Sequence, residues 1–216
     1  MTPHGAMDLV RLVARHNLHP EQDLHPSWLP REWPARHRQV PRFGPASRAV
    51  LADLLRRDAG EPLYDVDSRM RRLVLLDGPS LRRLAAYSGL CAHKPLFKLR
   101  GVGSQLRRTA RRIDPDAAEF VLERMPQLSE IRMNPRGLQE RPVSTGRVVI
   151  DRGYRLLLAA MASEGDAAGE RLRRKLPRRV ASLSVPQLDP RQLAQLREVM
   201  LLCIVPERLP QWDWLF

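Results

Sequence analysis

Histidines are the first residues of this chain that could do chemistry, because five crowd into its N-terminal fifth: His4, His16, His19, His25 and His37. The spacing of three between His16 and His19 could place two imidazoles on one side of a metal ion. No cysteine or carboxylate completes a recognisable zinc-binding pattern. Histidines at helix ends and in a proline-rich loop explain the cluster better, so we expect no metal site.

A pair of glycines offers a second candidate, a phosphate-binding turn. Gly101-Val102-Gly103-Ser104 precedes a basic helix, as such turns do. The third glycine and the lysine of the Walker motif are missing, and no strand is predicted before the turn. We therefore interpret the two glycines as a break between helices.

The potential nucleophiles and acid–base groups do not form a catalytic set. Cys91 and His93 lie two residues apart on a predicted helix, so their side chains diverge. Cys91 and Cys203 sit in apolar helical patterns and are predicted to be small core residues. A helix cap and turn positions account for three aspartates: Asp65, Asp67 and Asp77. We predict that the protein is not an enzyme and that it has no catalytic residue, cofactor or metal.

The elements that position these residues are helical, because the apolar residues recur with a period near 3.6. We expect an all-α fold, a compact single-domain bundle of about seven to nine helices over residues 1–216. Start and stop signals predict where these helices lie. The first ones are expected over Ala6–His16, from Ala46 to near Gly60, from a cap at Asp67 to a stop at Gly78, and from Pro79 through Leu90. Further helices are expected after Gly103, from Asp114–Pro115, over residues 144–161 and 170–177, and from Asp189–Pro190 to Pro206. Only Arg147–Ile150 allows a short strand. Residues predicted to face the core include Val50, Leu51, Leu54, Leu55, Leu81, Leu84, Ala85 and Leu90.

Prolines set residues 1–45 apart from the helical core predicted over 46–216. They stand at positions 20, 26, 30, 34, 41 and 45, where they remove backbone donors and disfavour helix in the preceding residue. Four large apolar side chains indicate that this irregular segment packs on the core and is not a linker: Trp28, Leu29, Trp33 and Phe43.

The most distinctive pattern is STGRVVIDRGYRLLLAAM over residues 144–161, followed by ERLRRKLP over residues 170–177. Ser144 and Thr145 cap an apolar run, and a sharply basic helix comes next. The pattern predicts a helical hairpin made for packing against another surface.

The chain is strongly basic, with 37 Lys and Arg against 24 Asp and Glu and a net charge of +13. Such an excess is compatible with nucleic acid or an anionic membrane surface. The arginine pairs are spread along nearly every predicted helix, starting at residues 56, 71, 82, 107, 111, 173 and 178. Spread pairs favour solvated helix faces and an acidic protein partner.

Two further observations concern compartment and partners. The first residues carry Asp8 and lack the apolar core of a secretory signal, and no apolar run is long enough to span a membrane, so we expect a cytosolic protein. Trp212 and Trp214 lie close to the C-terminus, where aromatic side chains either fix the end onto the core or anchor a partner.

Three stretches resemble the SctK family (YscK/PscK-like), the adaptor of type III secretion sorting platforms. They are RLVLLDGPSLRRLAAYSGL, the hairpin with ERLRRKLP, and a last helix leading through a proline to a terminal Leu-Phe. The early HPSWLP also fits the proline- and tryptophan-containing start of such proteins. The resemblance covers residues 70–216 well and the first third loosely.

The resemblance implies a non-enzymatic cytoplasmic adaptor beneath the basal body, at the cytosolic face of the inner membrane. It implies that the adaptor links the cytosolic forkhead-associated-like domain of the ring protein SctD to the pod protein SctQ, with the ATPase complex reached indirectly. From the residues themselves we expect basic helix faces to dock the acidic ring-protein domain. The candidate partner-binding residues are Arg107, Arg108, Arg111, Arg112, Arg173, Arg174, Arg178, Arg179, Trp212 and Trp214.

The alternative is a basic helical regulator that binds nucleic acid. It requires a recognition helix presenting Arg, Lys, Asn and Gln on one face, and phosphate contacts with strong salt dependence. The poverty in lysine and the lack of a clear helix-turn-helix disfavour it.

Overall fold

The computed structural model describes residues 3–34, 37–58, 61–126, 128, 131, 138 and 144–216. These residues form helices and turns without a strand, so the all-α prediction is confirmed. The α-helices are α1 (Pro3–Leu18), α2 (Pro45–Asp58), α3 (Gly78–Ala92), α4 (Val102–Ile113), α5 (Ala117–Glu119), α7 (Thr145–Met161), α8 (Asp166–Lys175), α9 (Arg178–Ala181), α10 (Pro190–Glu198) and α11 (Val205–Arg208). In the part of the chain that the structure describes, no helix combines the length and the apolarity needed to cross a membrane.

Short 3-10 and π segments connect these helices. The 3-10 segments are η1 (Pro20–Asp23), η2 (Pro26–Trp28), η4 (Val40–Arg42), η5 (Arg71–Leu75), η6 (Lys94–Lys98) and η10 (Pro210–Leu215), and the π segments are η7 (Phe120–Arg124) and η9 (Val199–Ile204).

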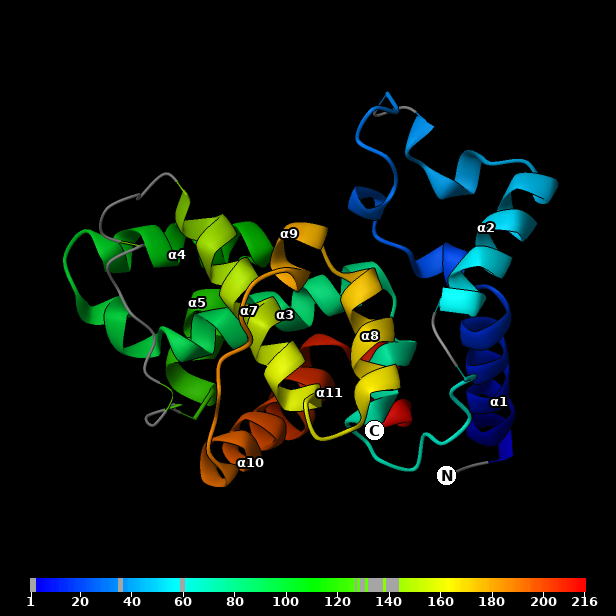
Figure 1. Cartoon of the computed structure of the whole chain (residues 1–216). Helices are drawn as coiled ribbons and strands as arrows, with labels where there is room; N and C mark the ends of the chain where they lie inside the picture. Colours follow the sequence, from blue (N-terminus) through cyan, green and yellow to red (C-terminus); the bar gives the residue numbers. More distant parts are fainter. Residues whose placement is uncertain are drawn as a thin grey trace. The chain divides into compact units, whose positions relative to one another are not determined.

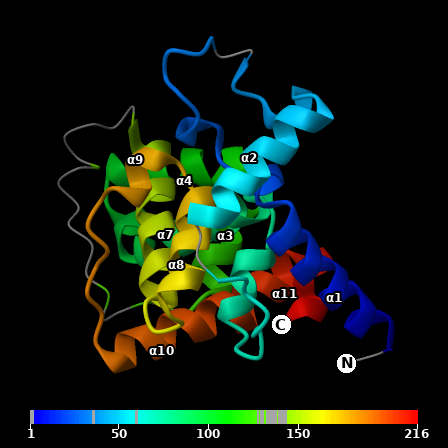
Figure 2. The same cartoon turned by 45° about the vertical axis from the view of Figure 1, so that its right-hand side comes forward.

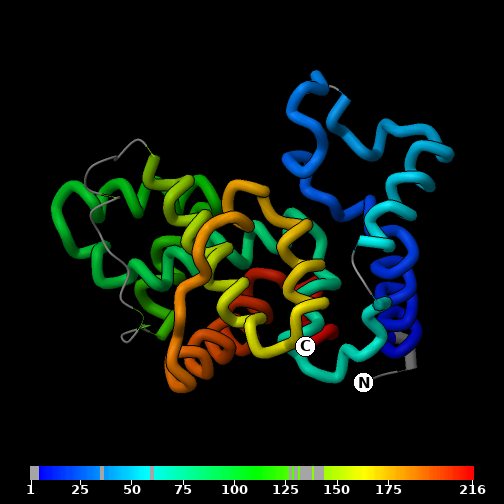
Figure 3. Tube along the Cα trace, viewed as in Figure 1, coloured from blue at the N-terminus to red at the C-terminus, as the bar shows by residue number. Residues whose placement is uncertain are grey.

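The chain divides into two compact units, each assembled from segments that are distant in sequence. Unit 1 comprises Met1–Gly78, Met161–Leu183 and Trp214–Phe216, and unit 2 comprises Pro79–Ala160 and Ser184–Asp213. Figure 3 follows the chain as it leaves unit 1 after α1, α2 and η5 and returns to it at the end of α7. The single domain expected over residues 1–216 stays a prediction.

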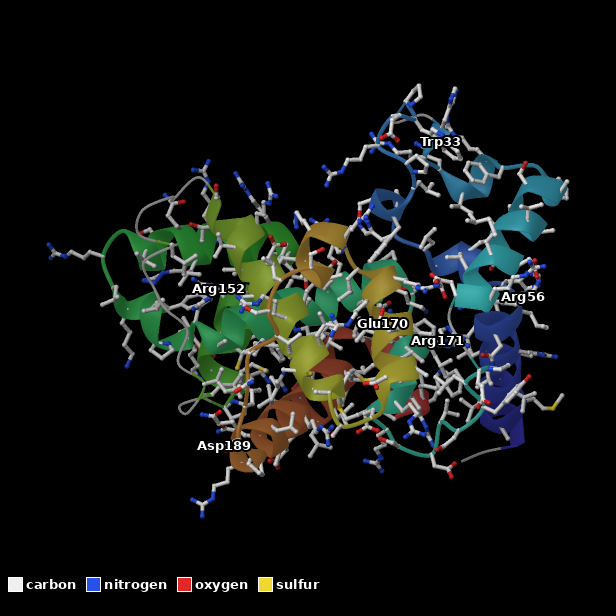
Figure 4. The ribbon with its side chains drawn as sticks, viewed as in Figure 1. Trp33, Arg56, Arg152, Glu170, Arg171 and Asp189 are labelled. Carbon is white, nitrogen blue, oxygen red and sulfur yellow. The ribbon has the colours of Figure 1, made fainter. Side chains whose placement is uncertain are left out.

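The proline segment of unit 1 forms a small core of its own with α2. Figure 1 shows it looping from the end of α1 to the start of α2, and it consists of the short turns η1, η2 and η4, each with a proline at its beginning. Leu24, Leu29 and Val40 are buried in this core, and the side chains packed against them are Trp28, Phe43, Leu51 and Leu55. Trp33 lies at the tip of the loop (Figure 4), where its ring meets Phe43 edge-on at 6.1 Å.

The predicted inward face of α2 is only partly right. Leu51 and Leu55 pack on the proline-segment core, but Val50 and Leu54 are 62% and 57% exposed, so their inward prediction was wrong. The core is narrow and receives positions i and i+4 of the helix, which leaves the neighbouring apolar positions in solvent.

Unit 2 is built around α3 and α7, which lie side by side (Figure 2). Glycine permits their approach, because a Cβ atom on Gly89 would lie 2.1 Å from the carbonyl oxygen of Val149, and one on Gly153 would lie 1.7 Å from that of Ala85. The predicted core positions of α3 are confirmed as buried, namely Leu81, Leu84, Ala85 and Leu90. Arg147–Ile150 belongs to α7, so the short strand was wrong.

The helical hairpin and the first helix are confirmed as α7 with α8 and as α1, each within a few residues of the predicted bounds. The cap at Asp189 is also confirmed, because its carboxylate accepts from the backbone N–H groups of Arg191 and Gln192. The Gln192 side chain bonds back to the N–H of Asp189, which completes a capping box. The end predicted near Gly60 lies just outside the described residues, and α2 ends at Asp58.

Three residues that were predicted to cap or stop a helix do not do so. The N-cap position of η5 is Met70 and not Asp67, and Gly78 starts α3 instead of stopping a helix. The Asp114 carboxylate binds other side chains and does not cap α5.

Pro206 does not close the last helix, which continues as α11. The preceding turn, η9, has π-helical hydrogen bonding. Its wider turn accommodates a residue that lacks a backbone N–H, so the proline is tolerated inside the helix.

Candidate partner-binding surfaces

Two buried cations on α8 hold unit 1 together. Arg171 is only 7% exposed (Figure 4) and donates to the side-chain oxygen of Asn17 at 3.0 Å and to the carbonyl of Glu61 at 2.9 Å. The Asn17 amide in turn exchanges two hydrogen bonds of 2.9 Å with the backbone of Leu63. Arg171 therefore ties α1 to the segment that follows α2.

Lys175 makes the second buried contact. Its Nζ donates to the Asp23 carboxylate at 2.7 Å and to the carbonyl of Leu76 at 3.0 Å, while its side chain is 4% exposed. Burial lowers the pKa of Lys175, and the Asp23 carboxylate opposes that shift. A buried amine with two acceptors fixes η1 and the end of η5 against α8.

The sequence singled out four arginines of unit 1, and two of them lie on α8 beside these contacts. Arg174 bonds the Asp58 carboxylate at 2.6 Å and the carbonyl of Leu55 at 3.1 Å. Arg173 binds Glu170 at 3.2 Å and the carbonyl of Ala181 at 3.3 Å.

The other two lie on α9. The guanidinium of Arg178 stacks over the ring of Trp28 at 5.6 Å, and Arg179 is exposed. The Trp28 indole N–H donates to the carbonyl of Leu176, which further fixes this corner of unit 1.

In unit 2, α4 presents three of its four arginines to solvent. Gly103, Leu106 and Ala110 face inward. Arg107 is half-buried and donates to the carbonyl of Phe97 at 2.6 Å. The remaining arginines of α4 are exposed and, within the described residues, make no hydrogen bond or ion pair: Arg108, Arg111 and Arg112. We call these three residues the α4 arginine face.

An open pocket of about 410 Å³ lies beside this face, entirely within unit 2. Its apolar side chains come from α3, α4, α7 and the segment after α11, namely Ala86, Ile113, Ile150 and Leu209. Three guanidinium groups also line it: Arg82, Arg83 and Arg112. Pro79, Ser80 and Gln211 complete the lining. We call it the arginine pocket.

A polar cluster fixes one wall of the arginine pocket. Arg83 pairs with Asp114 at 2.7 Å, and the same carboxylate accepts a short hydrogen bond from the Tyr87 hydroxyl. Burial and this bond to Asp114 raise the pKa of Tyr87, so the phenol stays protonated. Arg208 stacks over Phe120 at 3.9 Å and bonds Asp116 at 2.8 and 3.0 Å.

The two C-terminal tryptophans have different environments. Trp212 is half-buried, and its indole N–H donates to the Ser80 hydroxyl at 2.8 Å, which holds η10 to α3 in unit 2. Trp214 belongs to unit 1 and is 40% exposed. A role for either residue in binding a partner stays a prediction.

The histidines differ in burial, because His16 and His93 are buried whereas His19 and His37 are exposed. Among the described residues, no group of three or more His, Cys, Asp or Glu side chains is placed to hold a metal ion. His16 is buried, and burial together with the charges of Lys175 and Arg171 lowers its pKa to about 2. Burial lowers the pKa of His93 to about 3, and its Nε2 lies 3.0 Å from a guanidinium nitrogen of Arg152 (Figure 4).

The cysteines and the glycine pair are structural. Cys91 is fully buried, as predicted, with its pKa raised to about 12 by burial, whereas Cys203 is only half-buried. The glycines form the predicted break: Gly101 has a φ of 75°, and a Cβ on Gly103 would lie 2.3 Å from the carbonyl oxygen of Phe97.

Sequence reasoning missed the buried pair Arg171 and Lys175 and the pocket residue Arg82. The signal for the first two was their spacing of four, which places both on the same side of α8 as Leu172 and Ala168. No sequence signal marked Arg82, since its role arises from residues that α4, α7 and the C-terminal segment bring to it.

Comparison with known proteins gives one result. The model of the family described as YOP proteins translocation protein K (YscK) matches residues 14–208. No curated protein and no solved structure matches the chain.

Proposed function

The chain belongs to the YscK family and is therefore a type III secretion protein, and from this premise we propose that it serves as a non-enzymatic adaptor of the sorting platform. In this role it links the cytosolic domain of the ring protein SctD to the pod protein SctQ, and through them reaches the ATPase complex indirectly. Its place is the cytosolic face of the inner membrane, beneath the basal body.

The observation that supports this proposal is the burial of the potentially reactive side chains and the exposure of the arginines. His16, His93 and Cys91 are buried, and exposed guanidinium groups on α4 make no hydrogen bond or ion pair within the described residues. Such a surface recognises another macromolecule through complementary charge and transforms no small molecule.

The α4 arginine face is the better candidate for docking the acidic domain of SctD. Its three guanidinium groups are exposed, so binding a carboxylate breaks no internal contact. Arg173 and Arg174 of unit 1 already bind Glu170 and Asp58, and a partner would have to displace those contacts. We therefore propose that Arg108, Arg111 and Arg112 bind the ring protein, and that the pod protein binds another surface of the chain.

Co-purification with the SctD cytosolic domain and SctQ tests the proposal. We expect the parent chain to capture both, and Arg108→Glu/Arg111→Glu to bind the SctD domain about tenfold more weakly at low salt, with a smaller difference at high salt. The matched control is Arg56→Glu/Arg57→Glu on α2 (Figure 4), which changes the net charge equally and should bind nearly as the parent does.

Two results would overturn the proposal. Failure of the parent chain to capture either protein removes the adaptor function. Tight retention of random duplex DNA at moderate salt would favour the nucleic-acid alternative instead.

A further inference from the structure

The arginine pocket combines an apolar floor with an excess of positive charge. Ala86 and Leu209 are buried, and Ile113 and Ile150 are half-buried, so the floor accepts an apolar side chain. Arg82 and Arg112 are exposed at the rim, and neither makes a hydrogen bond or ion pair within the described part of the chain. A volume of about 410 Å³ falls within the range of ligand-binding pockets, roughly 300–1,000 Å³.

The third guanidinium group differs from the other two, because Arg83 is already paired with Asp114. Its charge is thus partly neutralised, and its position is fixed. The rim therefore offers the free guanidinium groups of Arg82 and Arg112. The planar N–H donors of each group can bind both oxygens of a carboxylate.

The walls of the pocket are held in place by a side-chain hydrogen bond and an ion pair. The Trp212 indole N–H on the Ser80 hydroxyl fixes the segment that carries Leu209 and Gln211 to the start of α3. The Arg208 pair with Asp116 fixes the end of α11. A preformed site loses little conformational entropy when a ligand binds.

From these features we propose that the arginine pocket binds a short acidic peptide segment of a protein partner, with one apolar side chain on the floor and carboxylates on Arg82 and Arg112. The inference rests on the proposed function, because it names the chemistry of a partner segment of the adaptor. Single-stranded nucleic acid fits less well, since no aromatic side chain among the described lining residues offers a base a stacking surface.

Fluorescence anisotropy with the full chain tests this proposal directly. The probe is a fluorescein-labelled heptapeptide, Gly-Glu-Asp-Leu-Glu-Asp-Gly, at physiological salt. We expect saturable binding that weakens about tenfold or more when the peptide acids become amides, and also when leucine becomes serine.

A pair of charge-matched variants locates the site. Arg82→Glu/Arg112→Glu should weaken peptide binding about 10- to 100-fold, because two charge-assisted contacts are lost. Arg56→Glu/Arg57→Glu on α2 carries the same change of net charge outside the pocket and should alter binding less than about threefold at this salt. Ile150→Ser probes the floor and should weaken the leucine peptide but not the serine peptide. Circular dichroism confirms that each variant is folded.

Each outcome has one meaning. Equal binding by both double variants, or equal binding of the acid and amide peptides, overturns the inference. A lipid or nucleic-acid ligand would replace the acidic peptide if phosphatidylglycerol vesicles or oligo-dT bind where the peptide does not, and if only Arg82→Glu/Arg112→Glu abolishes that binding.

The inference and the proposed function can fail separately. If the parent chain co-purifies with its partners but binds no peptide, the inference fails while the proposed function stands. If the parent chain captures neither partner, the proposed function fails whatever the peptide does.

Discussion

Unit 1 and unit 2 each contain a short basic helix, α8 and α4, and the two helices use their positive charges in opposite ways. On α8, Arg171 and Lys175 are buried and bound to groups 99 to 154 residues away in sequence. On α4, the three residues of the arginine face are exposed and make no such contact within the described residues. In unit 1 the charges of α8 thus join distant segments, whereas in unit 2 those of α4 remain on the surface and the close contact is that between α3 and α7.

The difference teaches that a basic helix is not in itself a binding surface. A buried cation needs acceptors to offset the loss of hydration, and α8 finds them in Asp23 and in backbone carbonyl groups. An exposed guanidinium group keeps its water and remains available to a partner.

The largest expected effect comes from removing a buried cation. Lys175→Met leaves the Asp23 carboxylate and the carbonyl of Leu76 without their donor, so the free energy of unfolding should fall by about 3–5 kcal/mol. Urea unfolding followed by circular dichroism measures it. The exposed residue Lys98 provides the control, since Lys98→Met should change the value by less than about 0.5 kcal/mol. A loss below about 1 kcal/mol for Lys175→Met would break the comparison.

Unit 2 should instead be sensitive to an added methyl group. Gly153→Ala places a Cβ atom 1.7 Å from the carbonyl oxygen of Ala85, so α3 and α7 must separate at a cost of about 3 kcal/mol or more. The matched control is Gly169→Ala on α8, where no atom lies within 4 Å of the added Cβ. That substitution should stabilise the protein by about 0.5–1 kcal/mol, and thermal unfolding distinguishes the two.

Low pH should lower the stability of unit 1 through the protonation of His16. Its pKa is about 2 in the folded state and 6.5 in the unfolded chain. Above pH 6.5 both states are neutral and His16 contributes nothing to the pH dependence. As the pH falls below that value, only the unfolded chain takes up the proton, so roughly 2 kcal/mol of stability is lost by pH 5.

His16→Leu tests this expectation, because it removes the titrating group from unit 1. The difference in unfolding free energy between pH 7 and pH 5 should shrink by roughly 2 kcal/mol relative to the parent chain. An undiminished pH dependence in this variant would show that His16 is not the group responsible.

The smallest effect is expected on the α4 arginine face. Arg108→Ala and Arg111→Ala remove charges that make no intramolecular contact within the described residues, so each should change stability by no more than about 0.5 kcal/mol. Differential scanning calorimetry checks this. A larger loss would show that α4, like α8, uses its arginines internally.

Local patterns in the sequence predicted much of the fold and little of the binding surface. The apolar period of α3 and the cap at Asp189 depend on residues within a few positions, so both could be predicted. Val50 and Leu54 were misassigned because only the shape of the proline-segment core decides which apolar positions of α2 are covered.

The arginines show the same limit more clearly. Arg108 and Arg174 stand in similar basic surroundings in the sequence, but Asp58 reaches only the second. The arginine pocket likewise exists because Arg82 of α3 and Arg112 of α4 come together beside Ile150 of α7. Such contacts depend on tertiary structure and leave no local pattern.

The interleaved order of the two units has a consequence for biosynthesis. When the ribosome has made the first 78 residues, the donors for Asn17, Asp23 and the carbonyl of Leu76 have not yet been synthesised, because they lie on α8. The nascent N-terminal third must therefore wait for nearly a hundred further residues before it can complete its fold. During that delay its apolar side chains are exposed substrates for chaperones.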